Sequence, residues 1–162
     1  MDKRALLAEL MFGSWSPLNF VLRPQGKHKL FVLAYHRIGY QAADYPFNRT
    51  ILSATPEQFD RQLQFVKDHF NVVNFHDLDR ILKKDGGISE NTLVITFDDG
   101  YKDNASTAAS LLQAHKLTAT FYVTTHNIDT GALLWFDLLH YFIRNIPKGQ
   151  YRLGEQQKMF DR

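Results

Sequence analysis

Two adjacent aspartates, Asp98 and Asp99, directly follow a segment that is expected to be a buried strand. That segment, TLVITF at residues 92–97, is apolar and β-branched, and a glycine comes after the acids. Neighbouring carboxylates repel each other unless a positive charge lies between them or one of them holds a proton. A pair of this kind can cap a turn, or it can combine a metal ligand with a general base.

A phosphotransfer site is a further alternative, but the pattern fits it poorly. Haloacid-dehalogenase-type phosphatases need acids two residues apart, as D-x-D, whereas this chain has D-D. Response-regulator receivers need a separate phosphoacceptor aspartate and a late lysine. Metal-assisted hydrolysis suits adjacent acids better, because residues leaving a strand end can point to different sides of one site.

The elements that must position the acids alternate along the chain. Apolar runs predict strands at residues 30–35, 71–75, 92–97 and 118–125, and helical spacing predicts helices at 55–70, 76–84, 104–116 and 136–145. This alternation indicates an α/β fold with a mostly parallel sheet and helices outside it. The first strand is expected to be buried on both faces, and the last helix to turn its apolar residues inward (Leu138, Leu139, Phe142 and Ile143).

Polar residues are expected to gather at one rim of this sheet. His36 and Arg37 follow the first strand, the acid pair Asp98 and Asp99 follows the third, and His126 ends the fourth. In parallel sheets, ligands bind beyond the carboxyl ends of the strands. This context favours a functional site over a simple turn.

Composition excludes several classes of function. The 162 residues carry 19 basic and 17 acidic side chains, and a net charge of +2 provides no basic face for nucleic acid. The absence of cysteine excludes disulfides, thiolate catalysis and Cys-based zinc sites. No apolar run reaches the roughly 18 residues of a membrane span, and no convincing signal peptide is present, which favours a cytoplasmic or membrane-peripheral protein.

Residues 1–29 are expected to form an N-terminal helical segment that covers one end of the fold. The alternative is a peripheral membrane contact through its apolar side chains (Leu6, Leu7, Leu10, Met11, Phe12 and Trp15).

Several segments together resemble the polysaccharide deacetylases (NodB-homology, carbohydrate esterase family four). TFDDGYKDN followed by LLQAHKLTATFYV resembles the first motif region of that family. LFVLAYHRIG resembles its opening strand, and FDRQLQFVKDHFNVVNFHDL resembles the helix, strand and helix that lead to the acids. The resemblance implies that residues 30–162 are part of a distorted (β/α) barrel that removes N-acetyl groups from a polysaccharide.

The resemblance also implies roles for individual residues. Asp98 corresponds to the general base, and Asp99 to a ligand of Zn²⁺ or a similar divalent ion, on which water is activated to attack the acetamide carbonyl. Apart from the resemblance, His36 at the end of the first strand is expected near Asp99 as a substrate contact or a support for the metal ligand, and direct metal ligation is the alternative. Tyr101 is expected beside the substrate, and packing is the alternative. Asp103 is expected to start the following helix.

The family completes its metal site with an H-x-x-x-H motif, and this sequence departs from that pattern. No two of its seven histidines are four residues apart. We therefore expect a truncated domain with an incomplete site, weak or absent activity, and marginal stability. The alternative is a non-catalytic carbohydrate-binding or interaction module on the same fold.

Overall fold

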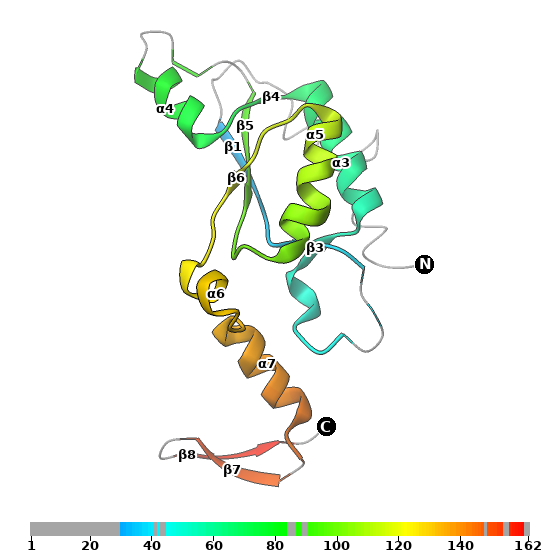
Figure 1. The fold of residues 1–162 in the computed structure, drawn as a ribbon, viewed down its shortest axis with the longest axis vertical. Coiled ribbons are helices and arrows are strands. Elements are labelled where there is room, and N and C mark those ends of the chain that lie inside the picture. The colour runs from blue at the N-terminus through cyan, green and yellow to red at the C-terminus, as the bar shows by residue number, and fades with distance from the viewer. Residues whose placement is uncertain are drawn as a thin grey trace. The chain divides into compact units, whose positions relative to one another are not determined.

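The computed structural model describes residues 30–40, 42, 45–83, 87–88, 91–147, 149–153 and 156–160 (Figure 1). The chain divides into two compact units, Met1–Tyr40 with Ile51–Thr124 and Gln41–Thr50 with Thr125–Arg162. We call their described parts the sheet unit and the helical unit. The helix expected within residues 1–29 lies outside the described residues, and the predicted limits 1–29 and 30–162 stay predictions.

Strand β5 (Thr92–Phe97) lies at the centre of a parallel sheet in the sheet unit (Figure 1). It pairs along its whole length with β1 (Leu30–Tyr35). On its other side it pairs with β4 (Asn71–Val72) at its start and with β6 (Thr120–Phe121) at its end. Parallel pairing requires long crossover connections, and helices provide them here. The predicted α/β class is confirmed.

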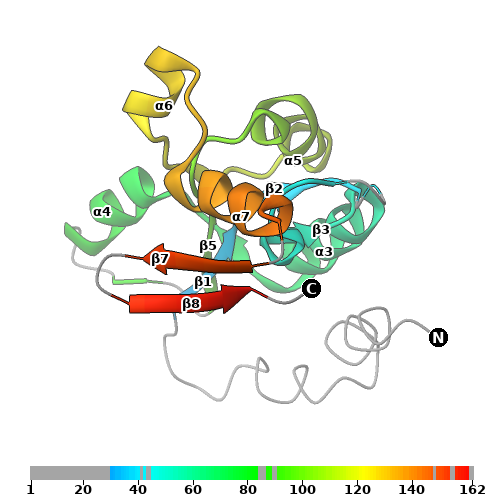
Figure 2. The same ribbon diagram turned by 90° about the horizontal axis from the view of Figure 1, so that it is seen from below.

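Helix α3 (Pro56–His69) begins where its sequence signal predicts. The Gln58 N–H donates to the Thr55 hydroxyl, and the Gln58 side chain accepts from the Thr55 N–H, which completes the capping box. Phe59 and Leu63 on its inner face are fully buried. Figure 2 shows α3 beside α5 (Ala109–His115), which continues from a π-helical segment, η2 (Asn104–Ala108).

Three aromatic rings join α3 to the strands in the main core. The Tyr35 ring centroid lies 5.1 Å from that of Phe59 and 5.4 Å from that of Phe97, and the Phe59 and Phe97 centroids are 5.7 Å apart. Each pair has the edge-to-face or stacked geometry that aromatic rings prefer. This cluster holds the carboxyl ends of β1 and β5 in place.

A smaller core lies on the opposite face of β5, under helix α4 (Phe75–Lys83). Val73, Leu78 and Val94 form its buried centre, and Ile81 packs against them. Leu82, which follows Ile81, is largely exposed.

The first strand is not buried on both faces as expected. Phe31 and Leu33 face the main core, whereas Leu30 and Val32, on the other face, remain 41% and 49% exposed. The α4 core covers that face of the sheet over β5 and does not extend to Leu30 or Val32. The sequence pattern shows that both faces are apolar, but not that both are covered.

The segment that follows β1 contains short elements. Strand β2 (Arg37–Ile38) pairs in parallel with β3 (Leu52–Ala54), and a 3₁₀ turn, η1 (Arg49–Ile51), precedes β3. The expected fourth strand is shorter than predicted: only β6 is extended, and α6 (Thr125–Thr130) begins at the next polar residues. His126 is therefore an exposed helical residue and does not end a strand.

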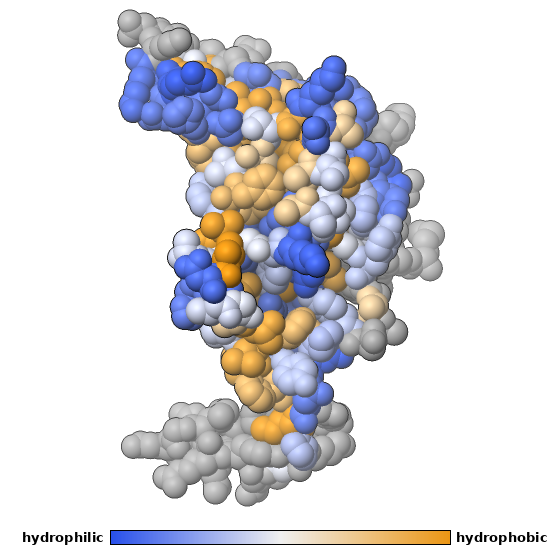
Figure 3. Space-filling view, viewed as in Figure 1, coloured by the Kyte–Doolittle hydropathy of each residue, from blue (hydrophilic) through white to orange (hydrophobic). Residues whose placement is uncertain are grey.

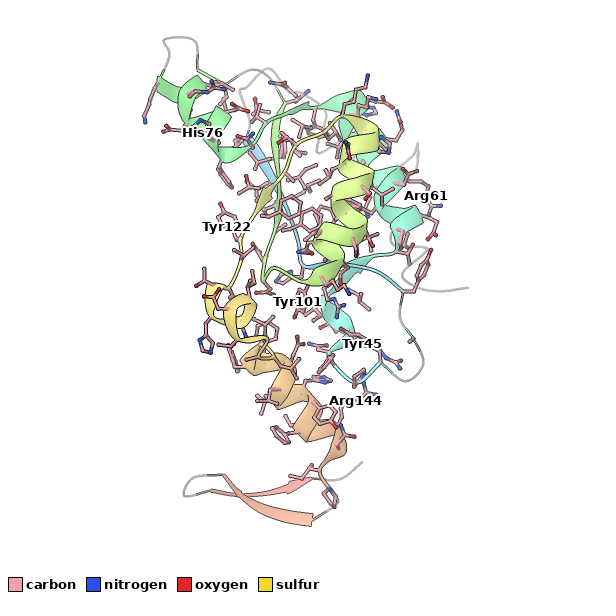
Figure 4. The ribbon with its side chains drawn as sticks, in the orientation of Figure 1. Tyr45, Arg61, His76, Tyr101, Tyr122 and Arg144 are labelled. Atoms are coloured by element: carbon pink, nitrogen blue, oxygen red, sulfur yellow. The ribbon has the colours of Figure 1, made fainter. Side chains whose placement is uncertain are left out.

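The helical unit contains α6, α7 (Trp135–Asn145) and an antiparallel hairpin of β7 (Gly149–Leu153) and β8 (Gln156–Phe160), which is clear in Figure 2. The Arg144 side chain donates to the Tyr45 carbonyl at 2.8 Å, so α7 is joined to the loop before η1 (Figure 4). In the part of the chain that is described, no helix is long and apolar enough to cross a membrane.

The inward face predicted for the last helix is wrong. Leu138, Leu139, Phe142 and Ile143 are between 41% and 58% exposed, and Figure 3 shows apolar surface over the α7 segment. Helical spacing correctly predicts an amphipathic helix. A pattern on one helix does not reveal whether another element covers its apolar face.

Candidate functional site

The predicted acids occupy the turn that leaves the central strand. The Asp98 N–H donates to the Tyr35 carbonyl at 2.9 Å, and the Tyr122 N–H donates to the Phe97 carbonyl at 2.8 Å. The end of β5 is therefore hydrogen-bonded to the chain on both sides. These backbone bonds fix the point from which Asp98 and Asp99 project.

The backbone turns sharply through two successive left-handed residues. Asp99 has φ of 73° and Gly100 has φ of 71°, a region that aspartate tolerates and glycine occupies freely. A Cβ at Gly100 would lie 3.2 Å from Cβ and Cγ1 of Val123, so a larger residue would require Val123 to shift as well as an unfavourable backbone conformation. The Thr124 hydroxyl donates to the Asp99 carbonyl at 2.8 Å and holds the same turn.

His36 lies next to the second acid, as its position after β1 predicts. Its Nε2 is 3.9 Å from Oδ2 of Asp99, with the two side chains 42% and 18% exposed. The His36 N–H donates to the Ser53 hydroxyl at 3.0 Å, which anchors the histidine backbone to β3. Because β1 and β5 are parallel and in register, their carboxyl ends bring the imidazole and the carboxylate together.

A partly buried ion pair joins the same two segments one step further along the chain. Both Nε and Nη2 of Arg37 lie 2.7 Å from Oδ2 of Asp103, and the Ile38 N–H donates to Oδ1 of Asp103 at 3.1 Å. The guanidinium carbon of Arg37 lies 4.7 Å from the centre of the Tyr101 ring. Figure 4 shows Tyr101 near the start of the η2–α5 helical segment.

Asp103 lies at the helix start, as expected, but its side chain does not cap the helix. It occupies the N-cap position of η2. Its carboxylate contacts Arg37 and Ile38 instead. Tyr101 packs against Arg37; a contact with substrate stays a prediction.

Burial perturbs one titratable group close to the site. The Tyr35 hydroxyl donates to Oε1 of Gln62 at 2.9 Å, and desolvation raises the pKa of Tyr35 well above its ordinary value of 10.0. Tyr35 therefore remains neutral at physiological pH and serves the core beneath the acids.

The donor set at this rim is of the kind that zinc uses. A carboxylate and a neutral imidazole are both common Zn²⁺ ligands, and Asp99 and His36 present one of each from adjacent strand ends. Within the described ranges, no three His, Cys, Asp or Glu side chains are arranged to hold one ion. The roles of Asp98, Asp99, His36 and Tyr101 stay predictions.

Sequence reasoning placed Arg37 at this rim but missed its contact with Asp103. It did not identify Ser53, which offers no signal of its own. Of the remaining histidines, His115 is largely buried and its Nε2 lies 2.7 Å from Oδ1 of Asp60 on α3. That contact fits the expected packing role.

Comparisons with known proteins show which sequences and structures this chain is similar to. Residues 85–152 match the family model described as polysaccharide deacetylase. The structure is similar to a Streptococcus pyogenes deacetylase, PplD, solved in complex with acetate, with 26% identity and a TM-score of 0.56, covering 69% of this chain and 50% of that one. A comparison with curated proteins gave no match.

Two further solved structures share the fold. A de-N-acetylase from Aggregatibacter actinomycetemcomitans has 19% identity and a TM-score of 0.53, covering 80% of this chain and 45% of that one. IcaB from Ammonifex degensii has 22% identity and a TM-score of 0.50, covering 60% and 39%. This chain thus spans half or less of the length of these proteins. Residues 85–152 match the polysaccharide deacetylase family model, and the resemblance to that family predicted from the sequence is confirmed.

Proposed function

We propose that this chain supplies the general base, Asp98, and two metal ligands, Asp99 and His36, of a metal-dependent polysaccharide deacetylase. The observation that carries the proposal is the rim of the sheet: Asp98 and Asp99 leave β5 together, and His36 Nε2 lies 3.9 Å from Asp99 Oδ2. Two ligand-type groups and a neighbouring carboxylate are thus concentrated at the strand ends, where parallel folds bind substrates.

In the proposed reaction, Asp98 removes a proton from the attacking water. The water oxygen bonds to the acetamide carbonyl carbon, the carbon–nitrogen bond breaks, and the proton is passed to the departing amine, which leaves acetate and a free amino sugar. Asp99 and His36 would hold the divalent ion. When bound, such an ion lowers the pKa of water and polarises a carbonyl. The substrate is an N-acetylated polysaccharide or oligosaccharide.

The remaining ligands are proposed to lie outside these 162 residues. Asp99 and His36 are two donors, whereas a catalytic zinc site uses about three protein ligands. No histidine pair in the sequence has the H-x-x-x-H spacing. We therefore expect Zn²⁺ to bind weakly to this chain, and acetate release from N-acetylglucosamine oligomers to be slow.

Calorimetric titration with Zn²⁺ tests the proposal directly. Asp99→Asn is the appropriate variant, because asparagine tolerates the left-handed backbone that alanine does not. We expect it to abolish measurable Zn²⁺ binding. Asp79→Asn is the matched control, since Asp79 is an exposed residue of α4 that pairs with Lys83. It should bind Zn²⁺ as the unaltered chain does.

Two results would contradict the proposal in different ways. Equal Zn²⁺ binding by the chain and by Asp99→Asn would show that Asp99 is not a ligand. Zinc-dependent acetate release at ordinary enzyme rates would show that these residues already contain a complete site. Oligosaccharide binding that is independent of both Zn²⁺ and Asp99 would instead favour the carbohydrate-binding module.

A further inference from the structure

The contact between His36 and Asp99 depends on how two separate segments are held together. Residues 36–38 leave β1, and residues 98–104 leave β5. The His36 side chain is 42% exposed, so packing alone does not hold its ring at 3.9 Å from Oδ2 of Asp99. Its position must come mainly from the backbone that carries it.

Asp103 is placed to anchor that backbone. Its Oδ2 accepts from two guanidinium nitrogens of Arg37, each at 2.7 Å, and its Oδ1 accepts the Ile38 N–H at 3.1 Å. One carboxylate therefore contacts both residues that follow His36. Charge-assisted hydrogen bonds of this kind are shorter and stronger than neutral ones.

Low solvent exposure and neighbouring groups strengthen this contact. The side chains of Arg37 and Asp103 are only 22% and 14% exposed, so the pair is screened less than a surface salt bridge. Tyr101 packs its ring against the guanidinium and so adds a second contact from the segment after the acids. Ile38 is completely buried, and the carboxylate satisfies its N–H.

We propose that Asp103 is a positioning residue: through Arg37 and the Ile38 N–H it holds His36 against Asp99. The inference rests on the proposed function, because the pair that Asp103 aligns is the proposed metal-binding pair. Asp103 touches neither the ion nor the substrate. Residues that orient metal ligands from outside typically change metal affinity by about ten- to a hundredfold when they are replaced.

The experiment compares Asp103→Ala, Asp103→Asn and Arg37→Lys with Asp79→Asn. Asp79 also forms a 2.7 Å ion pair, with Lys83, but both side chains are largely exposed and lie on α4. Thermal unfolding first establishes which variants are folded. Nuclear magnetic resonance without metal then measures amide exchange at Ile38 and the carbon–proton signals of the His36 ring, and calorimetry measures Zn²⁺ affinity.

We expect Asp103→Ala to accelerate exchange of the Ile38 amide at least about tenfold, since the acceptor of its hydrogen bond is gone. The His36 ring signals should shift or broaden, and Zn²⁺ affinity should fall about tenfold or more. Asp103→Asn, which keeps an oxygen for the Ile38 N–H, should protect that amide better than Asp103→Ala. Asp79→Asn should leave all three quantities unchanged.

The outcomes separate this inference from the proposed function. If the unaltered chain binds no Zn²⁺, the metal-binding proposal fails, and the Ile38 and His36 signals alone decide the positioning role. Unchanged His36 signals in a folded Asp103→Ala protein would overturn the inference. Unfolding of all three variants would also overturn it, because the contact would then serve the fold rather than the alignment of His36.

Discussion

Helices α3 and α7 have the same kind of sequence pattern but different surroundings. Both place apolar residues at helical spacing. Phe59 of α3 is completely buried between two other rings, whereas Phe142 of α7 is 58% exposed. The difference shows that amphipathic spacing specifies a helix and its apolar face, while burial depends on a partner element that the spacing does not encode.

Removing one ring from each helix should give the largest contrast. Phe59→Ala leaves a cavity between Tyr35 and Phe97, and we expect it to lower the free energy of unfolding by about 3–5 kcal/mol. Phe142→Ala removes a mostly exposed side chain and should change that free energy by no more than about 0.5 kcal/mol. Urea unfolding followed by circular dichroism measures both. A large loss in Phe142→Ala would mean that the apolar face of α7 is covered in solution.

Two glycines sharpen the comparison between the units. Gly100 in the sheet unit and Gly131 in the helical unit have similar φ values, 71° and 67°, but only Gly100 has a neighbour, Val123, within 3.2 Å of an added Cβ. Alanine in a left-handed conformation costs about 1–2 kcal/mol, which both variants should show. Gly100→Ala should lose more in the same urea experiment, because Val123 must also move. Equal losses would indicate that this contact yields freely.

The smallest contrast concerns alkaline pH. The pKa of buried Tyr35 is raised in the folded protein, so the folded state keeps the proton longer than the unfolded state. Its contribution to stability is fully present below about pH 10 and is lost as pH rises toward the folded pKa. The slope reaches at most about 1.4 kcal/mol per pH unit.

Unfolding measured from pH 8 to pH 11 tests this dependence. Tyr35→Phe should remove the slope, at a constant cost of about 1 kcal/mol for the lost hydrogen bond to Gln62. Tyr141→Phe, at a half-exposed site of α7, is the control and should retain the slope. A slope that persists in Tyr35→Phe would assign the alkaline transition to another group.

Local signals in the sequence account for the parts of the fold that were predicted well. The capping box at Thr55 and Gln58 fixes the start of α3, and the continuous apolar run before Asp98 predicts β5 to the residue. The proximity of His36 and Asp99 followed from a rule about neighbouring parallel strands. The contact between Arg37 and Asp103 could not be predicted in this way. The position of Asp103 in the sequence indicates a helix start, whereas its partner Arg37 is distant in the sequence and is seen only in the folded chain.

The exposed strand face and the shortened fourth strand have a similar cause. Leu30 and Val32 are as apolar as their neighbours, but their side chains stay exposed, and the core under α4 does not include them. Thr125 and His126 have no intrinsic helix signal, yet α6 begins there. In both cases the residue pattern of the segment does not by itself decide the outcome.

The parallel pairing of β1 with β5 has a consequence for the order of assembly. Leu30 pairs with Thr92 in the register, and helices α3 and α4 and strand β4 lie between the two strands in the sequence. The two strands can therefore pair only after this intervening chain is in place. Pairings between distant segments form slowly, since the entropy of closing the loop is lost before the contacts form. The contact between His36 and Asp99 is therefore expected to form late in folding. During synthesis, His36 and Asp99 cannot come together until the ribosome has released the chain well beyond Asp99.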